Sequence, residues 1–210
     1  MPIVQICEDG IEADDVISYI VNQHPEHKKV ILSSDKDFCQ LADKNTIIYR
    51  PISEEVITVE AALEKFGVHP SNLALSRAIE GDKSDNLPGV PGVGLKSLVK
   101  KMPFLKEEKF YTIEYLLEFA KEKMENDSSI VFSRIIENEQ LIRENYGLMQ
   151  LYTPNIHSSA KQNYDSIMER EIPKFNNKQI TSMFMEDGIF GLTLGKLFEH
   201  YNWMERIKND

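Results

Sequence analysis

The first part of the chain alternates between short apolar runs and polar stretches, and this pattern predicts strands separated by helices. Residues 3–6 and 29–33 are apolar and β-branched, and the second run is nearly continuous, as in a strand that a parallel sheet buries on both faces. Residues 45–49 and 56–59 predict two further strands. Apolar residues at helical spacing follow Glu12, so a helix is expected between the first two runs.

Strand signals fade from Pro70 onward, and the remaining apolar residues recur at helical spacing. Helices are expected at 60–66, 71–79, 112–124, 130–146, 178–185 and 192–207, with a short one ending at 41 and a polar loop at 152–163. The pattern therefore predicts an α/β domain at residues 1–69 and an all-helical domain at residues 70–210.

One stretch, residues 81–98, combines acidic residues with a turn that is dense in glycine and proline. It reads Gly-Asp-Lys-Ser-Asp-Asn-Leu-Pro-Gly-Val-Pro-Gly-Val-Gly-Leu-Lys-Ser-Leu, and apolar residues flank the turn on both sides. This spacing predicts a helix-hairpin-helix at about residues 79–102, in which glycines let backbone N–H groups approach a phosphate. The alternative is a tight interhelical turn with no ligand. The residues expected to contact DNA are Gly89, Val90, Gly92, Val93, Gly94, Lys96, Lys100 and Lys101.

The charge of the whole chain argues against simple nucleic-acid binding, because a protein binds phosphates through lysine and arginine and this one has a formal net charge of −10. The distribution of charge along the chain modifies this conclusion. Between residues 95 and 109 there are five lysines and two glutamates, which predicts a basic face on an acidic protein. An acidic metal site would account for part of the remaining excess, because bound cations neutralise it.

The sequence contains no apolar run close to the roughly 20 residues that cross a bilayer and no secretory signal pattern, so a cytoplasmic protein that is not secreted is expected. Its two cysteines, Cys7 and Cys39, fit neither a disulfide framework nor a Cys-x-x-Cys site. They are expected to be reduced structural thiols.

Acidic residues gather at three places where an expected element begins or ends. The candidates are Glu12, Asp14, Asp15, Asp35, Asp37, Asp82 and Asp85. The first three have an alternative explanation, since a helix dipole favours acids in the first turn, and an N-cap would explain one of Asp35 and Asp37. Glu12 and Asp14 could reach one site only if Glu12 precedes the first turn. Asp35 and Asp37 share a face if the chain is extended there, and Asp82 with Asp85 if it is helical.

Oxygen ligands without histidine or cysteine select hard cations, so Mg²⁺ is expected, with Mn²⁺ as a substitute. Seven carboxylates exceed the needs of one ion. Two ions about 4 Å apart would activate water on one side of a phosphodiester and stabilise the leaving oxygen on the other. No catalytic triad and no Walker-type phosphate loop is present in the sequence.

Three motifs in this order resemble the flap endonuclease and 5′-exonuclease family, which includes phage enzymes and the 5′-nuclease domain of bacterial DNA polymerase I. They are Glu-Ala-Asp-Asp from residue 12, Ser-Ser-Asp-Lys-Asp-Phe from residue 33, and the acidic and glycine-rich stretch from residue 81. The resemblance covers residues 12–98 and implies a partial PIN or Rossmann-like parallel sheet, followed by helices with a helix-three-turn-helix.

The resemblance also implies roles for these residues. Glu12, Asp14 and Asp35 match the family's tighter metal site, with Asp15 close by. Asp37, Asp82 and Asp85 match its second site, and residues 89–94 match the element that holds duplex DNA and can take K⁺. The implied substrates are 5′ flaps or 5′ ends on duplex DNA, including RNA primers on DNA, and the implied setting is DNA replication or repair in a bacterial or phage-infected cell.

The sequence departs from the family in one large respect. Family members begin with roughly a hundred residues that are missing here, including a strand ending in a metal-binding aspartate and a basic helical arch. The sequence is therefore expected to be either a fragment or the second half of a split enzyme, and in the second case a separate polypeptide would supply the missing half. Two other functions are alternatives to a 5′-nuclease. One is a non-catalytic, sequence-independent DNA-binding module, and the other is an unrelated Mg²⁺ phosphatase, which would not need the glycine hairpin.

Overall fold

The computed structural model describes residues 3–127, 129–171, 176–189 and 194–207, and it divides into two compact units. The larger unit comprises residues 10–156, and the smaller one combines residues 1–9 with residues 157–210. The border expected between residues 69 and 70 falls inside the larger unit, and that division stays a prediction.

A small mixed sheet forms one side of the larger unit. Strands β1 (Lys29–Leu32), β2 (Thr46–Arg50) and β3 (Glu55–Ile57) lie in the order β1-β2-β3. Strand β1 is parallel to β2, with Ile31 opposite Ile48, and β3 is antiparallel to β2. The first expected strand, residues 3–6, does not form in the structure, so that prediction was wrong. A single apolar run cannot satisfy its backbone groups without a neighbouring strand.

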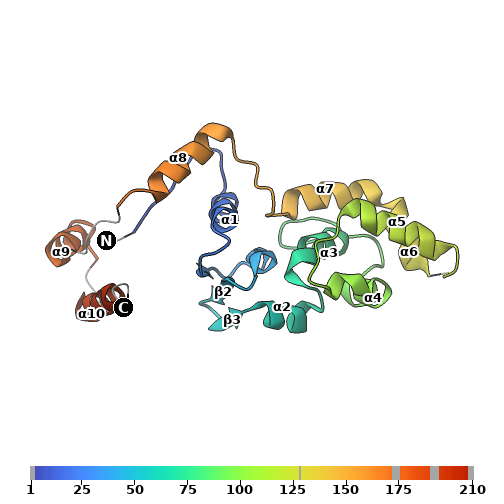
Figure 1. Cartoon of the computed structure of the whole chain (residues 1–210), viewed down its shortest axis with the longest axis horizontal. Coiled ribbons are helices and arrows are strands. Elements are labelled where there is room, and N and C mark those ends of the chain that lie inside the picture. Colours follow the sequence, from blue (N-terminus) through green and yellow to red (C-terminus); the bar gives the residue numbers. More distant parts are fainter. Residues whose placement is uncertain (1–2, 128, 172–175, 190–193, 208–210) are drawn as a thin grey trace. The chain divides into compact units, whose positions relative to one another are not determined.

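Helices connect and follow these strands in the larger unit (Figure 1). The elements up to the hairpin are α1 (Ala13–Gln23), η1 (Asp37–Leu41), α2 (Val59–Phe66), η2 (Pro70–Asn72) and α3 (Leu73–Glu80). The strand expected at 56–59 ends early because the Thr58 hydroxyl accepts the backbone N–H of Ala61 at 3.2 Å and caps α2.

The helices after the hairpin pack against α3 and against one another (Figure 1). They are α4 (Leu95–Lys101), η3 (Pro103–Lys106), α5 (Ile113–Met124), α6 (Ile130–Glu137) and α7 (Glu139–Met149). The single helix expected at 130–146 is broken at Asn138. The Asn138 side chain donates to the Arg134 carbonyl at 2.8 Å, which supplies a local alternative to a continuous helix.

Two hydrophobic clusters form the core of the larger unit. The first lies between the sheet and α1, η1 and α2, and includes Ile31, Ile48 and Ile57. The second lies among the helices and includes Leu98, Leu116 and residues of the hairpin. Helix α3 contributes to both, with Leu73 in the first cluster and Leu75 in the second. The acidic residues on either side of α3 are therefore held by a continuous packed framework.

The smaller unit contains α8 (Ser158–Met168), α9 (Asn177–Glu186) and α10 (Leu194–Ile207). The loop expected at 152–163 gives way to helix at Ser158, because His157 Nδ1 accepts the Ala160 N–H at 3.2 Å and caps α8. Tyr164 and Ile180 are buried in this unit. Residues 192 and 193 of the last expected helix lie outside the described residues.

Candidate functional site

Three of the predicted carboxylates converge at the end of α3. One oxygen from each of Asp37, Asp82 and Asp85 lies within 4.8 Å of the others. Asp37 is the first residue of η1, which follows β1 in the chain. Asp82 and Asp85 come just after α3. The end of a strand and the end of a helix therefore meet at one acidic cluster.

The backbone around these residues differs from the predicted one, which was extended at Asp35 and Asp37 and helical at Asp82 and Asp85. Asp35 Oδ1 accepts the backbone N–H of Asp37 at 2.9 Å, so residues 35–37 form a turn and are not extended. Asp82 and Leu87 exchange backbone hydrogen bonds of 2.9 and 2.8 Å in an isolated β-bridge, so residues 82–85 are not helical. The bridge reverses the chain and brings Asp85 back towards Asp82.

Positive side chains neutralise the buried part of this cluster. The guanidinium of Arg77, on α3, contacts the carboxylates of both Asp37 and Asp82, and Lys36 Nζ lies 2.9 Å from Asp82 Oδ2. Asp82 is only 3% exposed. Burial alone would raise the pKa of Asp82, but hydrogen bonds from Ser84 and Lys36 and the charge of Arg77 outweigh it and hold that pKa below its ordinary value.

The other four predicted ligands do not join this cluster. Glu12, Asp14, Asp15 and Asp35 form no group of three ligand atoms at this distance within the described part of the chain. Glu12 is the extended N-cap of α1, with φ −77° and ψ 152°, so it does precede the first turn as a shared site with Asp14 requires. Burial, helped by the charge of Asp14, raises the pKa of Asp15. Without a cation between them, such carboxylates repel one another.

The residues of the cluster fit a hard divalent cation. Asp37, Asp82 and Asp85 offer only oxygen donors, and Asp85 is exposed, so solvent can reach the site and complete a coordination sphere. A cation here would take over the charge compensation that Arg77 and Lys36 provide. The geometry places donors for one ion together; a second ion would need Glu12, Asp14 or Asp35 to move towards it.

Tight backbone packing requires glycine at two positions of the glycine-rich stretch next to this cluster. Gly81 has φ +80°, and a Cβ there would lie 2.4 Å from the nitrogen of Gly89. A Cβ on Gly89 would lie 1.9 Å from the carbonyl oxygen of Glu80. These two glycines therefore close the hairpin on α3, whereas a Cβ on Gly94 would meet nothing within 4 Å.

The residues expected to contact DNA divide into buried and exposed groups. Val90 and Val93 are 3% and 4% exposed and belong to the helical core, and their backbone N–H groups donate to the carbonyls of Ile79 and Val90 at 2.7 and 3.1 Å. Gly92, Gly94, Lys96 and Lys100 are exposed. Lys101 differs, because its ammonium pairs with Asp127 at 2.7 Å. The exposed group offers the backbone of two glycines and the side chains of two lysines to solvent.

Sequence reasoning missed two residues that organise this region. Arg77 bridges the two acidic segments, and Asn145 of α7 donates to the carbonyls of Ala78 and Pro88 at 2.9 and 2.8 Å. Both are polar residues at helical positions, and both are buried, at 6% and 2% exposure. A polar residue at a position that the helical period assigns to the core was the signal that could have identified them.

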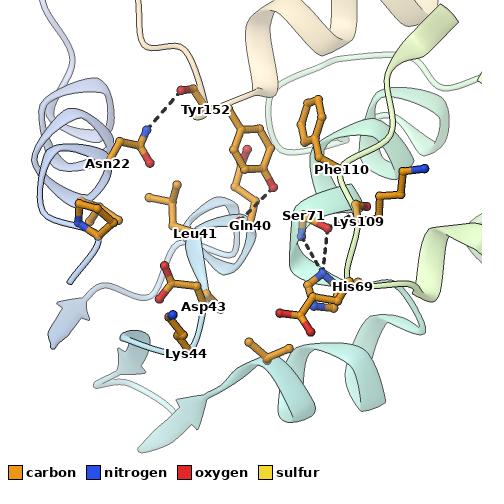
Figure 2. A pocket seen from close by; sticks show the side chains of 15 residues that line it. Asn22, Gln40, Leu41, Asp43, Lys44, His69, Ser71, Lys109, Phe110 and Tyr152 are labelled. Atoms are coloured by element: carbon orange, nitrogen blue, oxygen red, sulfur yellow. Dashed lines mark hydrogen bonds between the residues drawn. The ribbon is translucent and has the colours of Figure 1, made fainter. Parts of the chain in front are cut away.

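A separate cavity of about 410 Å³ lies next to η1 (Figure 2). Asn22 and Leu41 line one side of it, and Phe110 and His69 the other. Burial lowers the pKa of His69, whose Nδ1 accepts the Ser71 N–H at 3.3 Å. The Tyr152 hydroxyl donates to the carbonyls of Gln40 and Pro70, so it serves the packing between η1 and η2. None of the seven predicted carboxylates lines this cavity.

The described helices include none that is both long and apolar enough to span a membrane.

Cys39 is buried, which raises the pKa of its thiol, and Cys7 is exposed; neither forms a disulfide.

Comparison with known proteins gives matches along most of the chain. The profile of the 5′-3′ exonuclease N-terminal resolvase-like domain matches residues 1–67. The chain is 35% identical to a 5′-3′ exonuclease of Aquifex aeolicus over 146 residues, which are 69% of this chain and 46% of that protein. It is 34% identical to a DNA polymerase I of Caldicellulosiruptor bescii over 142 residues, which are 63% of this chain and 16% of that protein.

The fold has a solved counterpart. A bacteriophage T5 flap endonuclease in complex with DNA and metal ions superimposes with a TM-score of 0.63 at 20% identity, covering 78% of this chain and 61% of that one. The chain therefore spans about half the length of the exonuclease relative and shares the fold of a protein that was crystallised with DNA and metal.

Proposed function

The chain belongs to the flap endonuclease/5′-3′ exonuclease family, and from this premise we propose that it is the C-terminal part of a structure-specific 5′-nuclease. It would hydrolyse phosphodiesters at 5′ ends or flaps on duplex DNA, in replication or repair. The observation that carries the proposal is the meeting of Asp37, Asp82 and Asp85 beside a glycine-rich hairpin with exposed lysines.

Divalent cations, Mg²⁺ or Mn²⁺ in its place, would supply the activated water and stabilise the leaving oxygen. Asp37, Asp82 and Asp85 would hold one ion, and Glu12, Asp14 and Asp35, with Asp15 nearby, would hold another. Arg77 holds Asp37 and Asp82 in one place without an ion, and a bound cation would displace its guanidinium from their oxygens. The carboxylates therefore need little rearrangement to accept a cation, which favours catalysis.

The hairpin would hold the duplex through the backbone N–H groups of Gly92 and Gly94 and through Lys96 and Lys100, with K⁺ as an additional ion at the hairpin. These contacts would be to phosphates, so binding is expected to be independent of sequence. The buried packing of Gly81 and Gly89 fixes this surface relative to Asp82, so that a held backbone lies at a defined distance from the acidic cluster.

A separate polypeptide carrying the N-terminal half of the family's core is the expected partner, and the sheet supports this. Ile31, Ile48 and Ile57 bury one face of the sheet, but on the opposite face Val30, Leu32 and Val56 are 65%, 69% and 47% exposed. Strand β1 pairs with β2 alone among the described strands. Parallel strands are normally covered on both faces, so an uncovered apolar face beside a free parallel edge fits a polypeptide that adds strands and helices there.

The decisive experiment supplies the chain with a polypeptide that carries the family's N-terminal half, together with Mg²⁺ and a labelled 5′-flap duplex. Cleavage at the flap junction is expected, and Asp35→Asn is expected to abolish it. Double substitution of Asp82 and Asp85 by asparagine should leave DNA bound but uncut. An inert mixture in which the two polypeptides nevertheless form a stable complex would contradict the proposal.

A non-catalytic, sequence-independent DNA-binding module is the second candidate. It is favoured by the charge balance of the cluster, because Arg77 and Lys36 already compensate the buried carboxylates without a metal. Both candidates predict duplex binding through the hairpin. Only the nuclease predicts that the chain changes the length of a labelled flap substrate, so the cleavage assay separates them.

A further inference from the structure

A second group of potential metal ligands lies in the connection between α1 and β1. The sequence there is His-Pro-Glu-His, and one ligand atom from each of His24, Glu26 and His27 lies within 4.8 Å of the others. The imidazole rings of His24 and His27 are stacked, with centroids 5.3 Å apart and an interplanar angle of 21°. Glu26 Oε1 lies 3.6 Å from His27 Nε2.

The backbone that carries these side chains is a fixed turn. The N–H of His27 donates to the carbonyl of His24 at 3.2 Å, and Pro25 occupies the second position, where its restricted φ favours a β-turn. Ligands that are presented from a rigid turn lose little freedom when they bind an ion.

Neighbouring side chains hold this turn from both sides. Lys29 Nζ donates to the carbonyls of His24 and Val21 at 2.6 and 3.2 Å, which caps the end of α1. The Asn45 side chain donates to the carbonyl of Pro25 at 2.8 Å, and the Asn45 carbonyl accepts the N–H of Lys29 at 2.7 Å. The turn is thus tied to α1, to β1 and to the residue before β2.

Two imidazoles and one carboxylate bind borderline transition metals such as Zn²⁺, Cu²⁺ and Ni²⁺ better than they bind Mg²⁺. Ligands on opposite sides of one such ion are about 4 Å apart, so small side-chain rotations would bring these three into range. Glu26 and His27 are exposed, which leaves the rotations unhindered and the remaining coordination positions open to water.

This group is distinct from the acidic cluster. It precedes β1, whereas Asp35 and Asp37 follow that strand, and the four residues of β1 span roughly 13 Å. The donor chemistry differs as well, because Asp37, Asp82 and Asp85 offer oxygen only. The two groups would therefore take different ions at the same time.

We propose that His24, Glu26 and His27 form a transition-metal site in the turn that connects α1 to β1. Glu12, Asp14 and Asp15 lie at the start of α1. Asp35 and Asp37 follow β1. An ion at the turn stabilises the folded turn, because the folded chain holds the three ligands in one arrangement whereas the unfolded chain samples many.

The test uses Cu²⁺ at one equivalent in excess Mg²⁺, which occupies oxygen sites, with electron paramagnetic resonance as the readout. The wild-type chain is expected to show nitrogen superhyperfine coupling. The double variant H24A/H27A is expected to lose that coupling and to bind Cu²⁺ at least about tenfold more weakly. All three side chains are on the surface of the turn, so the variants are expected to fold.

The matched control is H157N/H200A, which removes two histidines outside the turn and keeps a capping residue at position 157. It is expected to behave as the wild type. In a second measurement, Zn²⁺ should raise the unfolding temperature of the wild type and of D82N/D85N but not that of H24A/H27A. Unchanged nitrogen coupling in H24A/H27A, or an unchanged Cu²⁺ affinity in E26Q, would overturn the three-ligand site.

Discussion

The side-chain amide of Asn145 donates to the main-chain carbonyl of Pro88 at 2.8 Å and so joins α7 to the turn that precedes the hairpin glycines. The same amide donates to the carbonyl of Ala78 on α3 at 2.9 Å. One buried residue from the later part of the chain thus holds both the helix before Asp82 and the chain after it.

Replacing Asn145 by leucine is expected to destabilise the fold, because two buried carbonyls lose their donor at about 1–3 kcal/mol each. Urea unfolding measures the loss. Gln140→Leu, on an exposed position of the same helix, is the control and should change the unfolding free energy by less than about 0.5 kcal/mol. Equal effects of the two variants would show that Asn145 does not hold the hairpin.

Replacing Arg77 by methionine is expected to lower stability without metal by about 3–5 kcal/mol, because the buried Asp82 and the half-buried Asp37 lose their shared cation. The same variant should bind Mn²⁺ more tightly than the wild type, since the ion no longer competes with a guanidinium. Thermal unfolding with and without Mn²⁺ measures both effects. Arg77→Lys should restore part of the stability; a weaker Mn²⁺ affinity in the methionine variant would contradict this account.

Two hairpin glycines, Gly89 and Gly94, allow a matched comparison of alanine substitutions. Gly89→Ala is expected to destabilise the fold strongly, because its Cβ would lie 1.9 Å from the Glu80 carbonyl oxygen and the backbone would have to shift. Gly94→Ala should be tolerated, since a Cβ there meets nothing within 4 Å. Comparable unfolding midpoints for the two variants would show that the turn packs differently.

Lys96→Ala is expected to weaken duplex binding equally for all sequences and to reduce the slope of log affinity against log salt by about 1. Fluorescence anisotropy at several salt concentrations measures the slope. Lys121→Ala, an exposed lysine on α5, is the control and should leave the slope unchanged. The same slope in both variants would remove Lys96 from the DNA-binding surface.

His69 predicts how stability depends on pH. Burial lowers the pKa of His69 below its ordinary value of 6.5, so the unfolded chain binds a proton there that the folded chain does not. The unfolding free energy should therefore fall as pH drops through about 6.5 and level off below the folded pKa. His69→Asn keeps an acceptor for the Ser71 N–H and does not titrate, so it should flatten this part of the curve. A curve of unchanged steepness would assign the dependence to other groups.

The sequence predicted most elements because their apolar residues follow a clear period. Strands β1 and β2 and helices such as α5 fall close to their expected positions. The strand expected at 3–6 failed because pairing depends on a neighbour, and a local pattern carries no information about one. The helix α8 was missed because its start depends on a histidine cap, a residue type that is rarely a capping signal.

The candidate site could be predicted only as far as residue type allows. The carboxylates were evident from the sequence, but their convergence depends on the turn at Asp35 and the bridge at Asp82, which tertiary packing creates. Arg77 was missed although the helical period assigns its position to the core, because the period does not say which charged groups an arginine meets there. The valines of the hairpin were assigned to DNA contact, whereas the structure places their side chains in the core.

The central claim is that Asp37, Asp82 and Asp85 hold a divalent cation next to a duplex-binding hairpin. A Mn²⁺ titration of the chain bound to a 5′-flap duplex, followed by electron paramagnetic resonance, tests it most directly. Asp85→Asn is the informative variant, because Asp85 is exposed and does not contact Arg77. The account predicts that this variant loses at least one bound Mn²⁺ while its metal-free affinity for the duplex is unchanged. The same number of bound ions at the same affinity in both proteins would contradict it.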